Sequence, residues 1–144
     1  MNKNERNNNV NETHLSYIQD VIKRMGQNSF QSKGWCITLD SALIAFNLAN
    51  RQADAAHVSI VIAIAVTVLF ALVDTYYLYL ERGYRYLYNM AAKIVERDLN
   101  YSDYVMTIPK CRRGFVQYLK TLFRFVTGMF YIVIIIGLIL LLVF

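Results

Sequence analysis

The sequence predicts an all-α membrane protein with three transmembrane helices, a basic cytoplasmic part and assembly as a homo-oligomer. The last twenty residues, 125–144, read FVTGMFYIVIIIGLILLLVF and contain no charge. That length is the ~20 residues that a helix needs to cross ~30 Å of hydrocarbon. Apolar residues make up 56% of the 144-residue chain, and the long apolar runs do not alternate as the strands of a membrane barrel do.

The N-terminal part is predicted to be a disordered tail followed by an amphipathic helix. Residues 1–12 include six asparagines and almost no large apolar residue, so we expect disorder there. A helix is predicted over 13–33, with Thr13 as the candidate N-cap. Its apolar residues follow at spacings of three and four: Leu15, Ile18, Ile22 and Met25. Gly26 and Ser29 weaken the pattern, so we expect the helix to end near them.

A transmembrane hairpin is predicted over 34–80. Its first segment, from Trp35 to Asn50, is short and polar, and its second runs from Val58 to about Leu80. The loop between them is brief, which forces the second segment to return antiparallel to the first. A lipid-facing carboxylate is costly, so the polar residues of the hairpin should face protein or water.

Three polar residues of the hairpin, Asp40, Asn47 and Asp74, allow two interpretations. Asp40 and Asn47 are seven residues apart and share a helix face, and Asp74 is expected at a similar depth to Asp40. In the first interpretation the acids form a ring around a cation pathway, which requires several subunits because three helices cannot enclose one. In the second, the acids pair with Lys33, Arg82 or Arg85 and hold the helices together. The residues leave both open.

The segment 81–122 is predicted to be a helical cytoplasmic part rich in cations and aromatic residues. The helical pattern continues without proline past Leu80 to about Asp98, so the second span should project out of the membrane. Nine Lys or Arg lie in residues 82–124 against three acids. A further helix should follow Pro109 and run into the final transmembrane helix at 123–144.

The charge distribution predicts the orientation. Of the fifteen Lys and Arg, only Arg51 lies in the loop between the first two spans. The positive-inside rule therefore places the N-terminus and the segment 81–122 in the cytoplasm. Residues 51–57 and the C-terminus then face outward.

The cytoplasmic part is a candidate for binding a nucleotide-type ligand. Cations can track phosphates while aromatic rings stack on bases, and eight of the eleven tyrosines lie between residues 74 and 104. Positive-inside charge and an interfacial tyrosine belt explain the same composition without a ligand. If a ligand binds, the candidate residues are Arg82, Arg85, Tyr84, Tyr88, Lys93, Lys110, Arg112 and Arg113.

Enzyme activity is not expected, and neither is a metal or a cofactor. His14 and His57 fall on opposite sides of the membrane in this topology and lack partners at ligand spacing. The six glycines are scattered and form no phosphate-binding loop. Cys36 and Cys111 are far apart and are interpreted as two reduced thiols.

Two motifs resemble those of a family of small bacterial membrane proteins from anti-phage defence loci. Residues 14–25, HLSYIQDVIKRM, are followed by Asn28-Ser29-Phe30 and Lys33-Gly34-Trp35. These are similar to the family pattern HLxFIQxVIxRMxxNSFxxKGW. Residues 74–82, DTYYLYLER, are similar to the pattern D-x-Y-Y-L-x-x-E-R, which ends the family's second span. The resemblance covers about residues 14–88, and within this group it points to the channel effector of Hailong-type defence.

The resemblance implies an oligomeric inner-membrane pore held shut by single-stranded DNA oligomers that a neighbouring nucleotidyltransferase makes. Opening of such a pore depolarises the membrane and arrests growth. The same motifs suit an effector gated by a cyclic nucleotide. An alternative from a different class is a non-conducting membrane anchor, or scaffold, that recruits a cytoplasmic partner through its helices.

Overall fold

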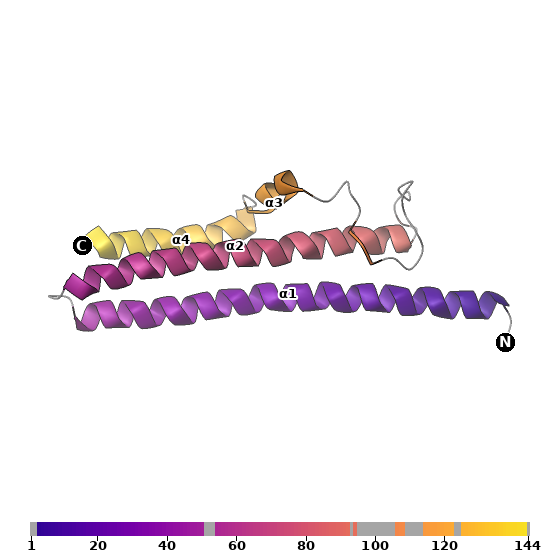
Figure 1. Ribbon diagram of the computed structural model, residues 1–144, viewed down its shortest axis with the longest axis horizontal. Helices are drawn as coiled ribbons and strands as arrows, with labels where there is room; N and C mark the ends of the chain where they lie inside the picture. Colours follow the sequence, from indigo (N-terminus) through magenta and orange to yellow (C-terminus); the bar gives the residue numbers. More distant parts are fainter. Residues whose placement is uncertain are drawn as a thin grey trace.

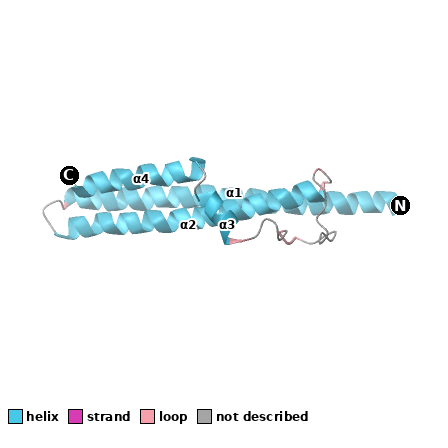
Figure 2. Ribbon diagram, turned by 90° about the horizontal axis from the view of Figure 1, so that it is seen from above, coloured by secondary structure: helices cyan, strands magenta, loops and turns pink. Residues whose placement is uncertain are grey.

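The computed structural model describes residues 3–50, 54–92, 94, 106–108, 114–122 and 125–143. Within these ranges the chain is all helical, which confirms the predicted class, and Figure 2 shows no strand among them. The four helices are α1 (Lys3–Ala49), α2 (Asp54–Ala91), α3 (Phe115–Leu122) and α4 (Phe125–Val143).

Helices α1 and α2 form a long antiparallel hairpin, as the short loop predicts (Figure 1). Helix α4 packs along the half of α2 that is nearest the turn, and the C-terminus lies at the same end of the molecule as the turn. Helix α3 lies against the middle of α2. The rest of the hairpin extends beyond α4 to the N-terminal end of α1. The chain therefore has a three-helix end and a projecting end.

Each end has its own packed interior. At the three-helix end, Ile60 and Ala63 of α2 and Leu138 of α4 are buried. Leu43 and Ile44 of α1 and Leu141 of α4 pack against this core. In the projecting end Ile18, Leu87 and Met90 are buried. There the Gln19 amide of α1 donates a hydrogen bond of 3.0 Å to the Tyr88 hydroxyl of α2.

Helix α1 differs from the sequence prediction because it is continuous. Helix begins at Lys3, where a disordered tail was expected, and passes through Gly26 and Ser29, where the first helix was expected to end. A glycine inside a helix costs only ~1 kcal/mol relative to alanine. Packing against α2 on both sides of Gly26 outweighs that cost, and extending an existing helix needs no new nucleus.

Helix α2 confirms that the second span continues past Leu80, since it runs unbroken to Ala91, but it ends there, before the expected end near Asp98. It begins at Asp54, four residues earlier than the expected start at Val58. The expected helix from Phe115 into the last span is assigned as two helices, α3 and α4. Residues 95–105 and 109–113, including Pro109, lie outside the described residues.

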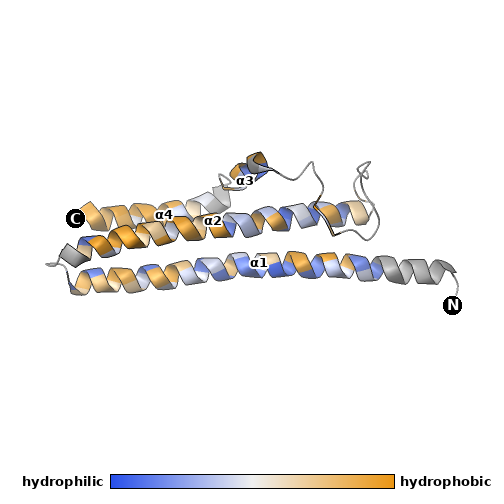
Figure 3. Cartoon of the chain, in the orientation of Figure 1, coloured by the Kyte–Doolittle hydropathy of each residue, from blue (hydrophilic) through white to orange (hydrophobic). Residues whose placement is uncertain are grey.

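Within the described residues, one helix is long and apolar enough to cross a membrane, over Ala56–Ala91 of α2. Gly128–Val143 of α4 forms a shorter apolar helix. Figure 3 shows that apolar residues dominate the coloured parts of α4 and of the half of α2 beside it, whereas the coloured part of α1 is mixed. The structure thus contains one candidate span of the three expected.

Candidate functional site

The polar residues of the hairpin lie on one face of α1 and are buried against α2. Asp40 and Asn47, predicted to share a face, are 3% and 6% exposed. Ser29, Lys33 and Cys36 extend this face at spacings of four and three. This polar face of α1 packs against α2 and not against lipid, as expected because a carboxylate in hydrocarbon is costly.

Asp74 of α2 is the centre of the first polar cluster. Its carboxylate is fully buried and forms an ion pair with Lys33 of α1, with 2.6 Å between Nζ and Oδ2. The Ser29 hydroxyl of α1 donates a hydrogen bond to the other carboxylate oxygen. Lys33 also donates to Ser29 Oγ at 3.0 Å. The buried charge is therefore paired and hydrogen-bonded, which is the condition under which buried ions are tolerated.

Asp40 of α1 forms a second cluster farther toward the turn. Its Oδ2 accepts a hydrogen bond of 2.8 Å from Thr67 of α2 and a weaker one of 3.4 Å from Cys36. Seven residues separate Asp40 from Lys33, and seven separate Thr67 from Asp74. The two acids therefore lie about two helical turns, or ~10 Å, apart along the hairpin rather than at a similar depth.

Asn47 links α1 to α2 close to the turn of the hairpin. Its side-chain amide donates a hydrogen bond of 2.8 Å to the backbone carbonyl of Ala56 in the first turns of α2. The three polar residues proposed for a pore, Asp40, Asn47 and Asp74, thus all bond across the α1–α2 interface within one chain. Their burial favours a structural role over an acidic ring. The expected pairing with a cation holds for Asp74, whose partner is Lys33, whereas Asp40 bonds to the neutral groups of Thr67 and Cys36.

Sequence reasoning named Lys33 as a possible partner of the acids but missed Ser29, Cys36 and Thr67. It also missed Tyr131 of α4, which is 4% exposed and close enough to Asp74 to interact electrostatically. The residues of α1 could have been predicted from their spacing of three, four or seven, which places them on one helix face: Ser29, Lys33, Cys36, Asp40 and Asn47. No sequence signal identifies Tyr131, because only the packing of α4 on α2 brings it to Asp74.

The described candidate ligand residues lie on the projecting half of α2. Arg85 is exposed and forms an i, i+4 ion pair with Glu81, with 2.7 Å between Nη2 and Oε1. Arg82 is partly buried and donates a hydrogen bond of 3.0 Å to Thr121 of α3. Tyr84 and Tyr88 are partly buried. Four other candidate ligand residues lie outside the described residues: Lys93, Lys110, Arg112 and Arg113. Of the two cysteines, Cys36 is a buried free thiol and Cys111 lies outside the described residues.

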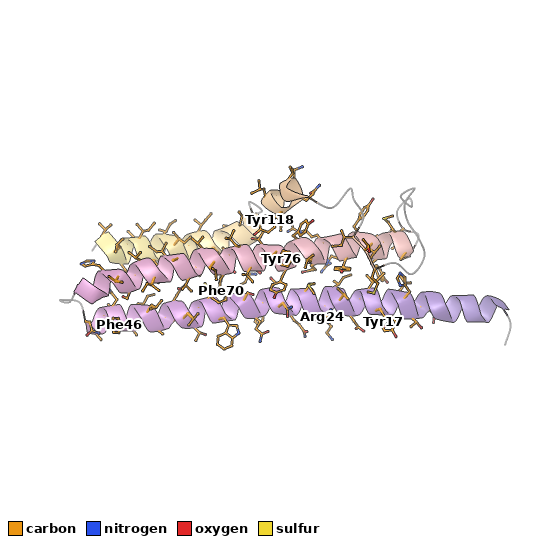
Figure 4. The ribbon with its side chains drawn as sticks, in the orientation of Figure 1. Tyr17, Arg24, Phe46, Phe70, Tyr76 and Tyr118 are labelled. Atoms are coloured by element: carbon orange, nitrogen blue, oxygen red, sulfur yellow. The ribbon has the colours of Figure 1, made fainter. Side chains whose placement is uncertain are left out.

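Helix α3 is held on α2 by tyrosine hydroxyls. Tyr118 lies between α3 and α2 (Figure 4). It donates a hydrogen bond of 2.9 Å to the Leu72 carbonyl of α2, and its ring lies edge-on to that of Tyr79. Burial raises the pKa of Tyr118 above its usual value, so its hydroxyl remains a donor at neutral pH. Before α3, Gly114 has φ of 130°, which favours glycine, and its N–H donates to the Tyr79 hydroxyl at 3.2 Å.

One face of α1 has no helix packed on it among the residues that the structure describes. Figure 4 shows Arg24 and Phe46 on the side of α1 that points away from α2. Both are exposed, as are Lys23 and Trp35. Among the described side chains, no group of three or more His, Cys, Asp or Glu is placed to hold a metal ion. Comparison of the chain with family models, curated proteins and solved structures gives no match.

Proposed function

We propose that this chain is an oligomeric effector of the bacterial inner membrane that conducts ions under the control of a nucleotide-type ligand. The observation that carries this proposal is a belt of outward apolar side chains on α1, α2 and α4 at the three-helix end. The belt includes Trp35, Phe46 and Leu48 of α1, Val61, Leu69 and Leu72 of α2, and Ile132, Val133 and Leu140 of α4. A soluble monomer rarely exposes so large an apolar area.

The dimensions of the belt support a membrane location. Large exposed apolar side chains run over 35–48 on α1, 58–76 on α2 and 129–143 on α4. At 1.5 Å per residue these stretches are ~20–28 Å long. The hydrocarbon core of a bilayer is ~30 Å thick, and Trp35 and Tyr76 suit its interface. All three helices then cross the membrane together.

The orientation follows from the charges. The turn of the hairpin and the C-terminus share one end of the molecule (Figure 1). The described cations Lys23, Arg24 and Arg85 lie toward the projecting end. The positive-inside rule puts that end in the cytoplasm and the C-terminus in the periplasm.

Conduction requires several copies of the chain. Within one copy the contact between α1, α2 and α4 is filled by side chains, and Ile60, Ala63 and Leu138 are at most 1% exposed. A water-filled pathway therefore has to form between copies arranged about a symmetry axis. Opening of that pathway depolarises the membrane and arrests growth.

The projecting hairpin is the proposed ligand-binding part. Arg85 is exposed there, and its guanidinium keeps donors beyond those used by Glu81. Tyr84 and Tyr88 lie on the same stretch of α2 and offer ring faces. With Lys93, Lys110, Arg112 and Arg113 they favour a single-stranded DNA oligomer, which a neighbouring nucleotidyltransferase supplies. A cyclic nucleotide is the second candidate.

Reconstitution into liposomes tests the proposal. Purified wild-type chain should leak ions, and the flux should change when a single-stranded DNA oligomer or a cyclic nucleotide is titrated at low salt. Expression of the chain alone should be toxic to the host cell. A chain that reaches the membrane but neither leaks under any ligand condition nor slows growth is instead an anchor or scaffold for a cytoplasmic partner.

A further inference from the structure

Small and polar residues follow one another along the face of α1 that points away from α2. They are exposed and recur at spacings of four and three, so they lie on a single stripe opposite α2. We define the α1 polar stripe as Gln27, Gln31, Gly34, Thr38, Ser41 and Ala45. It contains no large apolar side chain, although Thr38, Ser41 and Ala45 lie within the stretch 35–48 of the apolar belt.

The described side chains of α2 and α4 form no counterpart to the stripe within the belt. The exposed side chains of the belt are Val61, Val68 and Leu69 on α2 and Ile132 and Ile136 on α4, with similar residues between them. These faces suit lipid. The α1 polar stripe suits water better. The Ser41 hydroxyl has no hydrogen bond among the described residues, and a hydroxyl without a partner costs several kcal/mol in hydrocarbon, whereas the Thr38 hydroxyl is bonded to a backbone carbonyl.

An open groove lies along the first part of the stripe. The first four members of the stripe, with Lys23, Phe30 and Trp35, line this groove of about 910 Å³ on the surface of α1. Gly34 has no atom within 4 Å of the position that a Cβ would occupy. Thr38 is exposed and donates a hydrogen bond of 2.9 Å to the Gly34 carbonyl, so its hydroxyl oxygen can still accept one. The groove therefore has room for water beside polar groups.

Large apolar residues flank the stripe on both sides. Phe30 and Ile37 lie along one edge, and Trp35 and Phe46 lie along the other, all about half exposed or more. In a ring of copies these flanks can pack against neighbouring subunits while the stripe between them faces the axis. Toward the cytoplasmic end the same face carries charges of both signs.

Those charges favour a second copy of this chain as the neighbour. Asp20, Lys23 and Arg24 are exposed on the continuation of the stripe, and the structure gives none of them an ion pair among the described residues. One carboxylate beside two cations is self-complementary when copies repeat around an axis. It also leaves a net positive mouth, because each copy contributes one more cation than acid.

We infer that the α1 polar stripe lines the ion pathway of the assembled protein, and that Asp40 and Asp74 stay inside each protomer. This inference rests on the proposed function, since it requires a conducting oligomer. The lining within the belt is neutral, made of Thr38, Ser41 and Ala45, with Gln31 and Gln27 toward the cytoplasm, and the described charges on this face of α1 lie at the cytoplasmic mouth. Neutral dipoles replace part of an ion's hydration without binding it tightly.

Cysteine modification tests the inference. In a background carrying Cys36→Ala and Cys111→Ser, Thr38→Cys and Ser41→Cys are compared with Val68→Cys and Ile136→Cys on the lipid-facing surfaces. Each variant is reconstituted into liposomes, and ion flux is measured before and after a water-soluble cationic methanethiosulfonate reagent. We expect a severalfold loss of flux for the two α1 variants, reversed by reductant, and no change for the two controls.

The outcomes separate the inference from the proposed function. If the unmodified background conducts and the reagent blocks neither α1 variant, the stripe does not line the pathway, although the channel proposal stands. If the wild-type chain does not conduct, both proposals fail. If only the background is silent, Cys36, which is buried and bonds to Asp40, is kept, and the four variants are compared with Cys111→Ser alone. Ser41→Cys changes one atom, so it keeps the test available where Thr38→Cys fails to assemble. Block at Val68→Cys or Ile136→Cys instead places the pathway along α2 or α4 and also overturns the inference.

Discussion

Removing either partner of the Lys33–Asp74 ion pair should destabilise the protein, and by unequal amounts. The Asp74 side chain is 0% exposed, whereas that of Lys33 is 25% exposed. Lys33→Met leaves a buried carboxylate with the Ser29 hydroxyl as its remaining described hydrogen-bond donor. We expect a loss of ~3–5 kcal/mol, the usual cost of an uncompensated buried charge.

Asp74→Asn should cost less, ~1–3 kcal/mol, because the amide can still bond to Ser29 and because the partly exposed lysine can turn its ammonium toward water. The double variant Lys33→Met/Asp74→Leu removes both charges. Replacing a buried ion pair by apolar residues is often close to neutral. We therefore expect the double variant to be more stable than Lys33→Met alone.

The assay is unfolding of the purified protein in detergent, followed by loss of helical circular dichroism in denaturant and analysed as a double-mutant cycle. Arg85→Met is the matched control. It breaks the ion pair with Glu81, but Arg85 is 64% exposed, and such surface pairs contribute ~0–1 kcal/mol. If Lys33→Met costs no more than Arg85→Met, or if the cycle shows no coupling, the argument from burial is refuted.

Three further predictions concern orientation, ligand binding and the docking of α3. A reporter fused after Phe144 should be active only in a periplasm-reading format and one inserted near Asn100 only in a cytoplasm-reading format; cytoplasmic activity at the C-terminus contradicts the three-span topology. Replacing Arg112 and Arg113 with Ala should weaken binding of a single-stranded DNA oligomer and flatten its salt dependence, since fewer phosphates are neutralised. An unchanged salt slope in a binding titration removes these residues from the site. Tyr118→Phe should lower the free energy of unfolding by ~1 kcal/mol, because the hydrogen bond to the α2 backbone is lost. Amide hydrogen exchange should become faster in α3 and stay unchanged in α4. Unchanged exchange in α3 means that other contacts hold this helix on α2.

The helical class and the antiparallel hairpin are determined by the sequence alone. A charge-free run of twenty residues and a short loop between apolar segments allow few other arrangements. The shared face of Asp40 and Asn47 is also predictable, because seven residues make about two turns of any α-helix. The same local rules predict that α2 passes Leu80, since no proline or strong C-cap stops it there.

Only the tertiary structure decides what that polar face does. The partners of Asp74 and Asp40 come from another helix, and the register of α1 against α2 selects Lys33 for one acid and Thr67 for the other. The continuity of α1 through Gly26 is likewise tertiary, because packing on α2 outweighs a weak local preference to stop. Burial of both acids between α1 and α2 leaves the opposite face of α1 outward. A single sequence shows which residues share a helix face, but the packing of the helices decides which face is buried and which is left for water, lipid or another copy.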